Sequence, residues 1–163
     1  MAARERAVLA LGSNLGDRGV HLREAVHRLR ALASSGHFRA SALYRTDPVD
    51  CAPGTPPFLN AAIEIECSLD PHELLAACQQ IERDLGRPAD HGFHTPRTVD
   101  IDILFLGEHV VDAPDLVIPH PRIAERAFVL LPLADIRPDL LPFPVSEAPG
   151  ASGCERLAKS WLT

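Results

Sequence analysis

The stretch that decides the fold is residues 59–85, LNAAIEIECSLDPHELLAACQQIERDL, in which a period of two gives way to a helical period. Apolar residues alternate with small or acidic residues over residues 59–67, which predicts a half-buried strand. Asp70 and Glu73 then have the spacing of a capping box, and apolar residues follow every three or four positions. A helix is therefore predicted, ending at Gly86.

The segments on either side predict further strands and helices. A continuous apolar run predicts a buried strand at residues 7–11, and Asp17 begins a predicted helix that Gly36 ends. Further strands are predicted at residues 38–44 and 99–106. A hairpin is expected at residues 107–118 and helical turns at residues 122–136, whereas residues 145–163 show no clear pattern.

The order β-α-β-β-α-β predicts an α+β fold, namely a ferredoxin-like sandwich with a mainly antiparallel sheet and helices packed on it. Two long loops interrupt this order, at residues 45–57 and 87–98. Loops of this length in a compact domain are typically functional or disordered. We expect both loops to border the active site.

Length and composition limit the function classes. A chain of 163 residues predicts one domain, 1–163, and a net charge of -6 argues against nucleic acid or an anionic membrane as the partner. The four cysteines have neither disulfide-motif nor zinc spacing, which predicts reduced thiols with Cys67 and Cys78 in the core. The sequence shows no signal peptide and no apolar run near 18 residues. We expect a cytoplasmic monomer.

The most specific chemical feature is the D-x-D pair in residues 99–106. Strand alternation turns Asp100 and Asp102 to one face, with the apolar residues up to Phe105 on the other. The carboxylates are then roughly 7 Å apart and repel by about 2 kcal/mol at an effective dielectric near 20. Mg²⁺ would relieve this repulsion, because it favours one or two carboxylates plus substrate phosphates. The alternative is a pair of ordinary surface aspartates.

Cationic and amide groups near this pair extend the hypothesis. Arg87 and Arg97 bracket the loop that leads into the strand, and arginine forks match phosphate oxygens. Metal ions plus arginines are what phosphoryl transfer requires. His120 lies between two prolines, and the amide of Asn60 could bind the edge of a heterocycle. Each of these residues also has an ordinary structural explanation.

Three functions stay open on the residues alone. The first is a pyrophosphokinase, and the second is another two-metal enzyme such as a phosphatase or a nucleotidyl transferase. The third is a non-catalytic ferredoxin-like module that binds a small ligand. The second leaves Phe58, Asn60 and Phe128 as core residues, and the third predicts that loss of Asp100 or Asp102 leaves ligand binding unchanged.

An ordered set of motifs resembles one known family. The set covers roughly residues 7–144 and comprises ALGSNLG (10–16), YRTDP (44–48), FLNAA (58–62), IE (81–82) with GR (86–87), PRTVDIDI (96–103), PHPR (119–122), ERAFVL (125–130) and PL (132–133). In this order the motifs resemble 6-hydroxymethyl-7,8-dihydropterin pyrophosphokinase of folate biosynthesis. Each motif is weak, but the ordered set is highly specific.

The resemblance implies a transfer of the β,γ-diphosphate of ATP to the pterin hydroxymethyl group, giving AMP. It implies that Asp100 and Asp102 hold two Mg²⁺ ions and that Arg87 and Arg97 stabilise the transferred group. The implied ATP-binding residues are Arg87, Arg97, Gln79, Glu82, Ile103, His120 and Arg126. The implied pterin-binding residues are Thr46, Pro48, Phe58, Asn60 and Phe128. The chain departs from the family pattern at Ala89, His94, Thr95 and Pro121, which concern loop closure and adenine contacts.

Overall fold

The computed structural model describes residues 3–48, 53–86 and 98–162, and most of its strands form one antiparallel sheet. The strand order is β5-β1-β4-β3-β8, and β2 also pairs with β4. The strands are β1 (Glu5–Ser13), β2 (Phe38–Ala40), β3 (Tyr44–Thr46), β4 (Phe58–Cys67), β5 (Asp100–Leu106) and β8 (Cys154–Arg156). The predicted mainly antiparallel α+β fold is confirmed.

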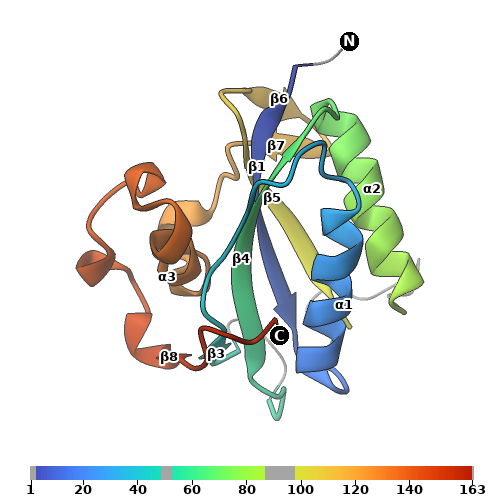
Figure 1. Ribbon diagram of the computed structural model, residues 1–163. Helices are drawn as coiled ribbons and strands as arrows, with labels where there is room; N and C mark the ends of the chain where they lie inside the picture. The colour runs from blue at the N-terminus through green and yellow to red at the C-terminus, as the bar shows by residue number, and fades with distance from the viewer. Residues whose placement is uncertain (1–2, 49–52, 87–97, 163) are drawn as a thin grey trace.

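Helices cover both faces of the sheet. Figure 1 shows α1 (Arg18–Arg30) and α2 (Pro71–Asp84) on one face and α3 (Ala127–Ile136) on the other. Each interface has its own cluster of buried apolar side chains. Strands β6 (Val111–Ala113) and β7 (Leu116–Ile118) form the predicted hairpin. Short 3-10 turns lie at Ile123–Glu125, Pro138–Leu140, Val145–Glu147 and Ala151–Gly153.

Helix starts follow the predicted caps, but one predicted helix end is wrong. The Asp70 side chain accepts from the Glu73 amide at 2.8 Å, and the Glu73 side chain accepts from the Asp70 amide at 3.0 Å, so the capping box is present. Helix α1 begins after Asp17 but ends at Arg30, before Gly36. The chain leaves the helix early because the Ser34 amide donates to the carbonyl of Glu66, at the end of β4.

Strand β4 is buried on both faces, so the expected half-buried strand is a wrong prediction. Its apolar face packs on α1 and α2, and its other face lies under α3. Glu64 on that second face is 0% exposed and accepts hydrogen bonds from Arg137 at 2.6 Å and His37 at 2.7 Å. The alternating sequence of β4 could not indicate that Glu64 is buried, because its partners His37 and Arg137 come from distant segments of the chain.

A β-bulge changes the faces of β5. Val8 pairs with Phe105 but Leu9 pairs with Ile103, so Leu104 is an extra residue. Leu104 and Phe105 therefore both pack in the α3 cluster, while Leu106 returns to the cluster under α1 and α2. The predicted face of Phe105 is wrong for this reason.

The C-terminal residues fold onto the sheet, although their sequence showed no pattern. Strand β8 pairs with β3, and Trp161 is buried in the cluster with α1 and α2. The predicted strand over residues 38–44 is split into β2 and β3. Cys67 and Cys78 are buried, as predicted. Within the described part of the chain, no helix is long and apolar enough to cross a membrane.

Candidate active site

The D-x-D pair lies at one end of the sheet, in register with residues of two other strands. Gly12 of β1 pairs with Asp100 on one side and with Asn60 of β4 on the other. Two residues further along both strands, Ala10 pairs with Asp102. Directly paired residues share a face of the sheet, so both carboxylates and the Asn60 amide point to the face that α3 covers. This confirms that Asp100 and Asp102 share a face.

Glu82 fixes the backbone between the two aspartates. It is a buried residue of α2, and its Oε2 accepts a hydrogen bond from the Ile101 amide at 2.8 Å. The contact crosses from the helix layer to β5, on the face opposite the carboxylates. Through this hydrogen bond, Glu82 anchors the strand that carries Asp100 and Asp102.

His120 sits beside this strand with one ring nitrogen already engaged. Its amide donates to the Leu104 carbonyl at 3.1 Å, and its Nδ1 accepts from the Arg122 amide at 3.2 Å. The proton of the neutral ring is therefore on Nε2, which can donate to a ligand. Burial, followed by the charges of Arg126 and Arg122, lowers the pKa of His120, and Asp100 opposes this shift.

Thr46 and Asn60 form a buried polar pair on the far side of Gly12. The Thr46 hydroxyl donates to Oδ1 of Asn60 at 2.5 Å, which orients the amide and leaves its NH₂ group available as donor. Register places Phe58 on the same face, paired with Thr46. A polar group for hydrogen bonding and an aromatic ring are thus adjacent, which suits a flat heterocycle.

Gly12 is in close contact with this pair. A Cβ atom on Gly12 would lie 2.7 Å from Nδ2 of Asn60 and 3.7 Å from the Phe58 ring. In the sequence, Gly12 stands out only as part of the motif ALGSNLG. The structure shows that its missing side chain makes room for the amide between the aspartates and Phe58.

Phe128 and Arg126 come from the start of α3. The Arg126 guanidinium lies 5.5 Å from the centroid of the Phe128 ring. Because α3 covers the face that carries Asp100, Asp102 and Asn60, both residues belong to the element that lies over the site. Sequence reasoning missed another link in this layer, since Tyr44 donates to Asp135 of α3 at 3.0 Å across 91 positions. No local pattern could have indicated it.

Of the remaining predicted site residues, some lie in the described part of the structure and some lie outside it. Gln79 is exposed on α2, and the Ile103 side chain is buried under α1 and α2, on the opposite face of β5 from the aspartates. Only the backbone of Ile103 can therefore contribute on the carboxylate face. Pro48 is the second residue after the end of β3. Arg87 and Arg97 lie outside the described residues.

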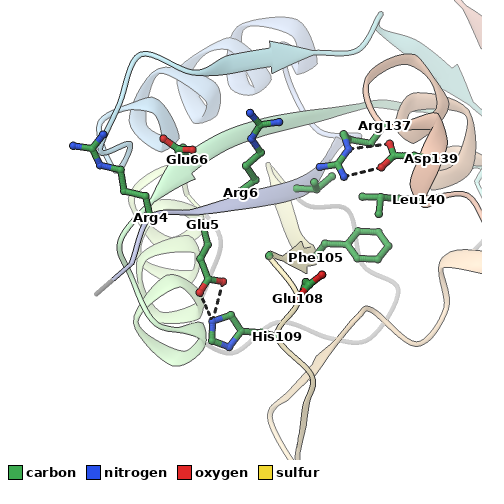
Figure 2. Close-up of a pocket in the computed structure, with 12 residues that line it drawn as sticks. Arg4, Glu5, Arg6, Glu66, Phe105, Glu108, His109, Arg137, Asp139 and Leu140 are labelled. Atoms are coloured by element: carbon green, nitrogen blue, oxygen red, sulfur yellow. Dashed lines mark hydrogen bonds and ion pairs between the residues drawn. The ribbon is translucent and has the colours of Figure 1, made fainter. Parts of the chain in front are cut away.

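A large hollow of about 880 Å³ lies at the other end of the sheet (Figure 2). Its lining includes Val8 of β1 and Phe105 of β5, so its near edge lies two residues of β1, roughly 7 Å, from the pair Ala10–Asp102. Four of its charged side chains form two pairs, His109 with Glu5 and Arg137 with Asp139 (Figure 2). The other charged side chains in its lining, Arg4, Arg6, Glu66 and Glu108, are of mixed sign. A lining of mixed charge does not favour a highly charged substrate, so the aspartate end remains the candidate site.

A family model for 7,8-dihydro-6-hydroxymethylpterin-pyrophosphokinase matches residues 8–138. The chain belongs to this family. A pyrophosphokinase of the family from Bacillus subtilis, 2-amino-4-hydroxy-6-hydroxymethyldihydropteridine pyrophosphokinase, is 47% identical over 130 residues, covering 80% of this chain and 77% of the relative. The protein of the same name from Methylorubrum extorquens is 45% identical over 136 residues, covering 83% and 85%. The predicted family resemblance is confirmed.

Other relatives are longer proteins, of which this chain matches only a part. The folate synthesis bifunctional protein of Arabidopsis thaliana is 45% identical over 132 residues, which are 81% of this chain but 27% of that protein. A crystal structure of Plasmodium falciparum HPPK-DHPS superposes with a TM-score of 0.67 at 18% identity, covering 90% of this chain and 45% of that chain. The structural match supports the fold of the pyrophosphokinase family.

Proposed function

We propose that the chain transfers the β,γ-diphosphate of ATP to the hydroxymethyl group of 6-hydroxymethyl-7,8-dihydropterin, in folate biosynthesis. The observation that carries the proposal is the row Asp100–Gly12–Asn60 across three strands. It sets carboxylates suited to metal-bound phosphates beside an amide suited to a heterocycle. Family membership supports the same reaction.

The donor set of the site fits Mg²⁺ only together with a substrate. Among the described residues no group of three or more His, Cys, Asp or Glu side chains could hold a metal ion. Two half-buried carboxylates on one strand face are the oxygen ligands that Mg²⁺ combines with phosphates. Asp100 and Asp102 would hold two such ions, which, when bound, neutralise charge on the phosphate oxygens.

The reaction follows from this arrangement. The pterin hydroxymethyl oxygen attacks the β-phosphorus and loses its proton, while the bond from that phosphorus to the oxygen of the α-phosphate breaks. The products are the pterin diphosphate and AMP. Asn60 and Thr46 bind the pterin edge beside Pro48, and Phe58 and Phe128 stack on its rings. Stacking and hydrogen bonding place the hydroxyl for attack, which is the main catalytic contribution in phosphoryl transfer.

The ATP side uses different elements. Nε2–H of His120 and the Arg126 guanidinium donate to phosphate oxygens. Arg87 and Arg97 stabilise the transferred diphosphate, while Gln79, Glu82 and the backbone of Ile103 border the nucleotide. We further propose that the protein works in the cytoplasm and is a monomer. Light scattering would test the monomer against the mass of one chain, 17.7 kDa.

The decisive experiment follows the nucleotide product. Purified protein is mixed with ATP, Mg²⁺ and 6-hydroxymethyl-7,8-dihydropterin, and AMP and ADP are separated by chromatography. We expect AMP that depends on the pterin and appears in equal amount with the pterin diphosphate. ADP as the product, or turnover indifferent to the pterin, would contradict the proposal and favour another two-metal enzyme.

Gly12→Ala should weaken pterin binding. The added Cβ would meet Nδ2 of Asn60 at 2.7 Å, so the amide must shift away from its present position. We expect the KM for the pterin to rise by about tenfold or more, as for a displaced binding group, with the KM for ATP nearly unchanged. Gly36→Ala is the matched control, because nothing lies within 4 Å of a Cβ there. An unchanged pterin KM would show that Asn60 does not bind the pterin.

ATP binding should strengthen as the pH falls toward the His120 pKa. Burial and two arginines lower that pKa in the free protein. Bound phosphates would raise it, and a ligand that raises a pKa binds more tightly to the protonated form. Calorimetric titration with ATP between about pH 8 and pH 6 should show a steeper gain for the wild type than for His120→Asn. The comparison removes the titration of ATP itself, and equal slopes would refute the contact.

A further inference from the structure

We infer that the C-terminal segment, residues 153–162, is a positioning element for the pterin side of the active site. This inference rests on the proposed function. The family match ends at residue 138, so the segment lies outside the part of the chain that the match covers. Figure 1 shows β8 beside β3, and in the strand order β8 is the edge strand opposite β5.

Residues 153–158 of the segment bond to β3 and to the residues on either side of that strand. Tyr44 pairs with Arg156 and Thr46 with Cys154. Backbone hydrogen bonds extend this pairing at both ends. They are Asp47 N to Gly153 O (2.9 Å), Leu157 N to Leu43 O (2.7 Å) and Leu43 N to Ala158 O (2.9 Å). Because β3 has only three residues, these bonds hold a strand that would otherwise be a short, open edge.

The end of the segment is anchored in the core. Trp161 is 5% exposed, and its indole Nε1–H donates to the Ser41 carbonyl at 2.9 Å. Ser41 is itself tied to β4, since its hydroxyl accepts from the Ala62 amide at 2.9 Å. Trp161 thus fixes the chain between β2 and β3.

The same segment reaches the α3 wall of the site. Arg156 of β8 lies 3.8 Å from Asp135 of α3, and Asp135 also accepts from Tyr44 and from the Ala42 amide, each at 3.0 Å. Burial and then the Asp135 hydrogen bond raise the pKa of Tyr44 to about 12, so its hydroxyl stays protonated as a donor. Residues 153–162 therefore join the strand that carries Thr46 to the helix that carries Phe128.

Because β3 lies on the pterin side of the sheet, its loosening should affect pterin binding more than ATP binding. Thr46 orients the Asn60 amide, and β3 lies two strands away from β1 and three from β5, which carries the aspartates. A loosened β3 should therefore disturb the Thr46–Asn60 pair while leaving the nucleotide and metal side in place. A purely structural role would lower stability and active fraction without separating the two substrates.

The test compares two substitutions at one exposed position in the full chain. Leu157→Pro removes the amide that donates to Leu43, whereas Leu157→Ala shortens the same side chain, which is 38% exposed, and keeps the amide. We expect the KM for the pterin to rise about three- to tenfold in Leu157→Pro, the range for one lost backbone hydrogen bond. The KM for ATP should change less than about twofold, within the error expected for a distant site, and Leu157→Ala should match the wild type.

Trp161→Phe provides a second test if Leu157→Pro fails to fold. It keeps an aromatic side chain in the core but removes the donor to Ser41, and the same selective rise in pterin KM is expected. An unchanged pterin KM in a folded variant, or equal changes for both substrates, would overturn the positioning role while the proposed function stands. A wild-type protein that forms no pterin-dependent AMP would refute the proposed function instead.

Discussion

Asp102→Asn and Asp100→Asn should each lower the rate of pterin-dependent AMP formation by about 1,000-fold or more, the scale of losing a central charge-stabilising group. Each change removes a negative oxygen ligand but keeps the size of the side chain. The row Asp100–Gly12–Asn60 should keep its register, because β5 is held by its pairing with β1 and by Glu82. Loss of rate with intact folding would therefore report on the metal ligands.

A control and a second measurement make this prediction sharp. Asp112→Asn changes an exposed aspartate of β6 in the same way and should leave the rate unchanged. Titration with Mg²⁺ in the presence of a nonhydrolysable ATP analogue should show weaker metal binding for both site variants. Variants that retain wild-type rates at saturating Mg²⁺ would show that the D-x-D pair does not act through metal ions.

Arg137→Leu should lower the free energy of unfolding by about 3 kcal/mol, the scale for a buried charge that loses its partner. Glu64 is fully buried, and Arg137 donates to its Oε2 at 2.6 Å while His37 holds Oε1. Without Arg137, the partners of the carboxylate among the described residues are His37 and the more distant Arg6, at 4.0 Å. Chemical denaturation followed by circular dichroism would measure the loss.

Two control variants test whether the loss of stability comes from leaving a buried charge without its partner. Arg28→Leu breaks exposed ion pairs with Glu24 and Asp84 and should cost at most about 1 kcal/mol. The double variant Glu64→Leu/Arg137→Leu should recover much of the loss, because no unpaired charge remains buried. A single Arg137→Leu variant as stable as Arg28→Leu would show that the Glu64 contact contributes little.

The same pair gives a pH dependence. Burial pushes the pKa of Glu64 upward, but hydrogen bonds and charge from Arg137 and His37 outweigh it and hold the pKa below its ordinary value of 4.5. A lowered pKa in the folded state stabilises the protein above pH 4.5, and this contribution is lost as the pH falls through the folded-state pKa. In Arg137→Leu the folded-state pKa of Glu64 should rise toward or above 4.5, so the part of the acid-dependent loss of stability that Glu64 causes should shrink.

Local signals predicted much of the fold. The alternation over residues 59–67, the capping box at Asp70 and the apolar run at residues 7–11 each act within a few positions of the chain, and the strands and the helix that they predict are observed, although β4 is buried on both faces. Long-range features were not predictable in this way. The bulge at Leu104 depends on the register of β1, and the cover over Glu64 depends on residues up to 73 positions away.

The candidate site shows the same division. The shared face of Asp100 and Asp102 follows from strand alternation, and it is confirmed. The anchoring of β5 by Glu82 and the pairing of Thr46 with Asn60 depend on how distant elements pack, so no local pattern could indicate them. The roles of Arg87 and Arg97 stay predictions.

The row Asp100–Gly12–Asn60 also has a consequence for biosynthesis. Its members lie on three strands that the ribosome makes far apart in time, and β5, which completes the row, is made after β1 and β4. Until β5 emerges, one edge of β1 has unpaired amide and carbonyl groups, which is a surface open to wrong pairing. The nascent protein therefore gains Asp100 and Asp102 and pairs the open edge of β1 in a single step.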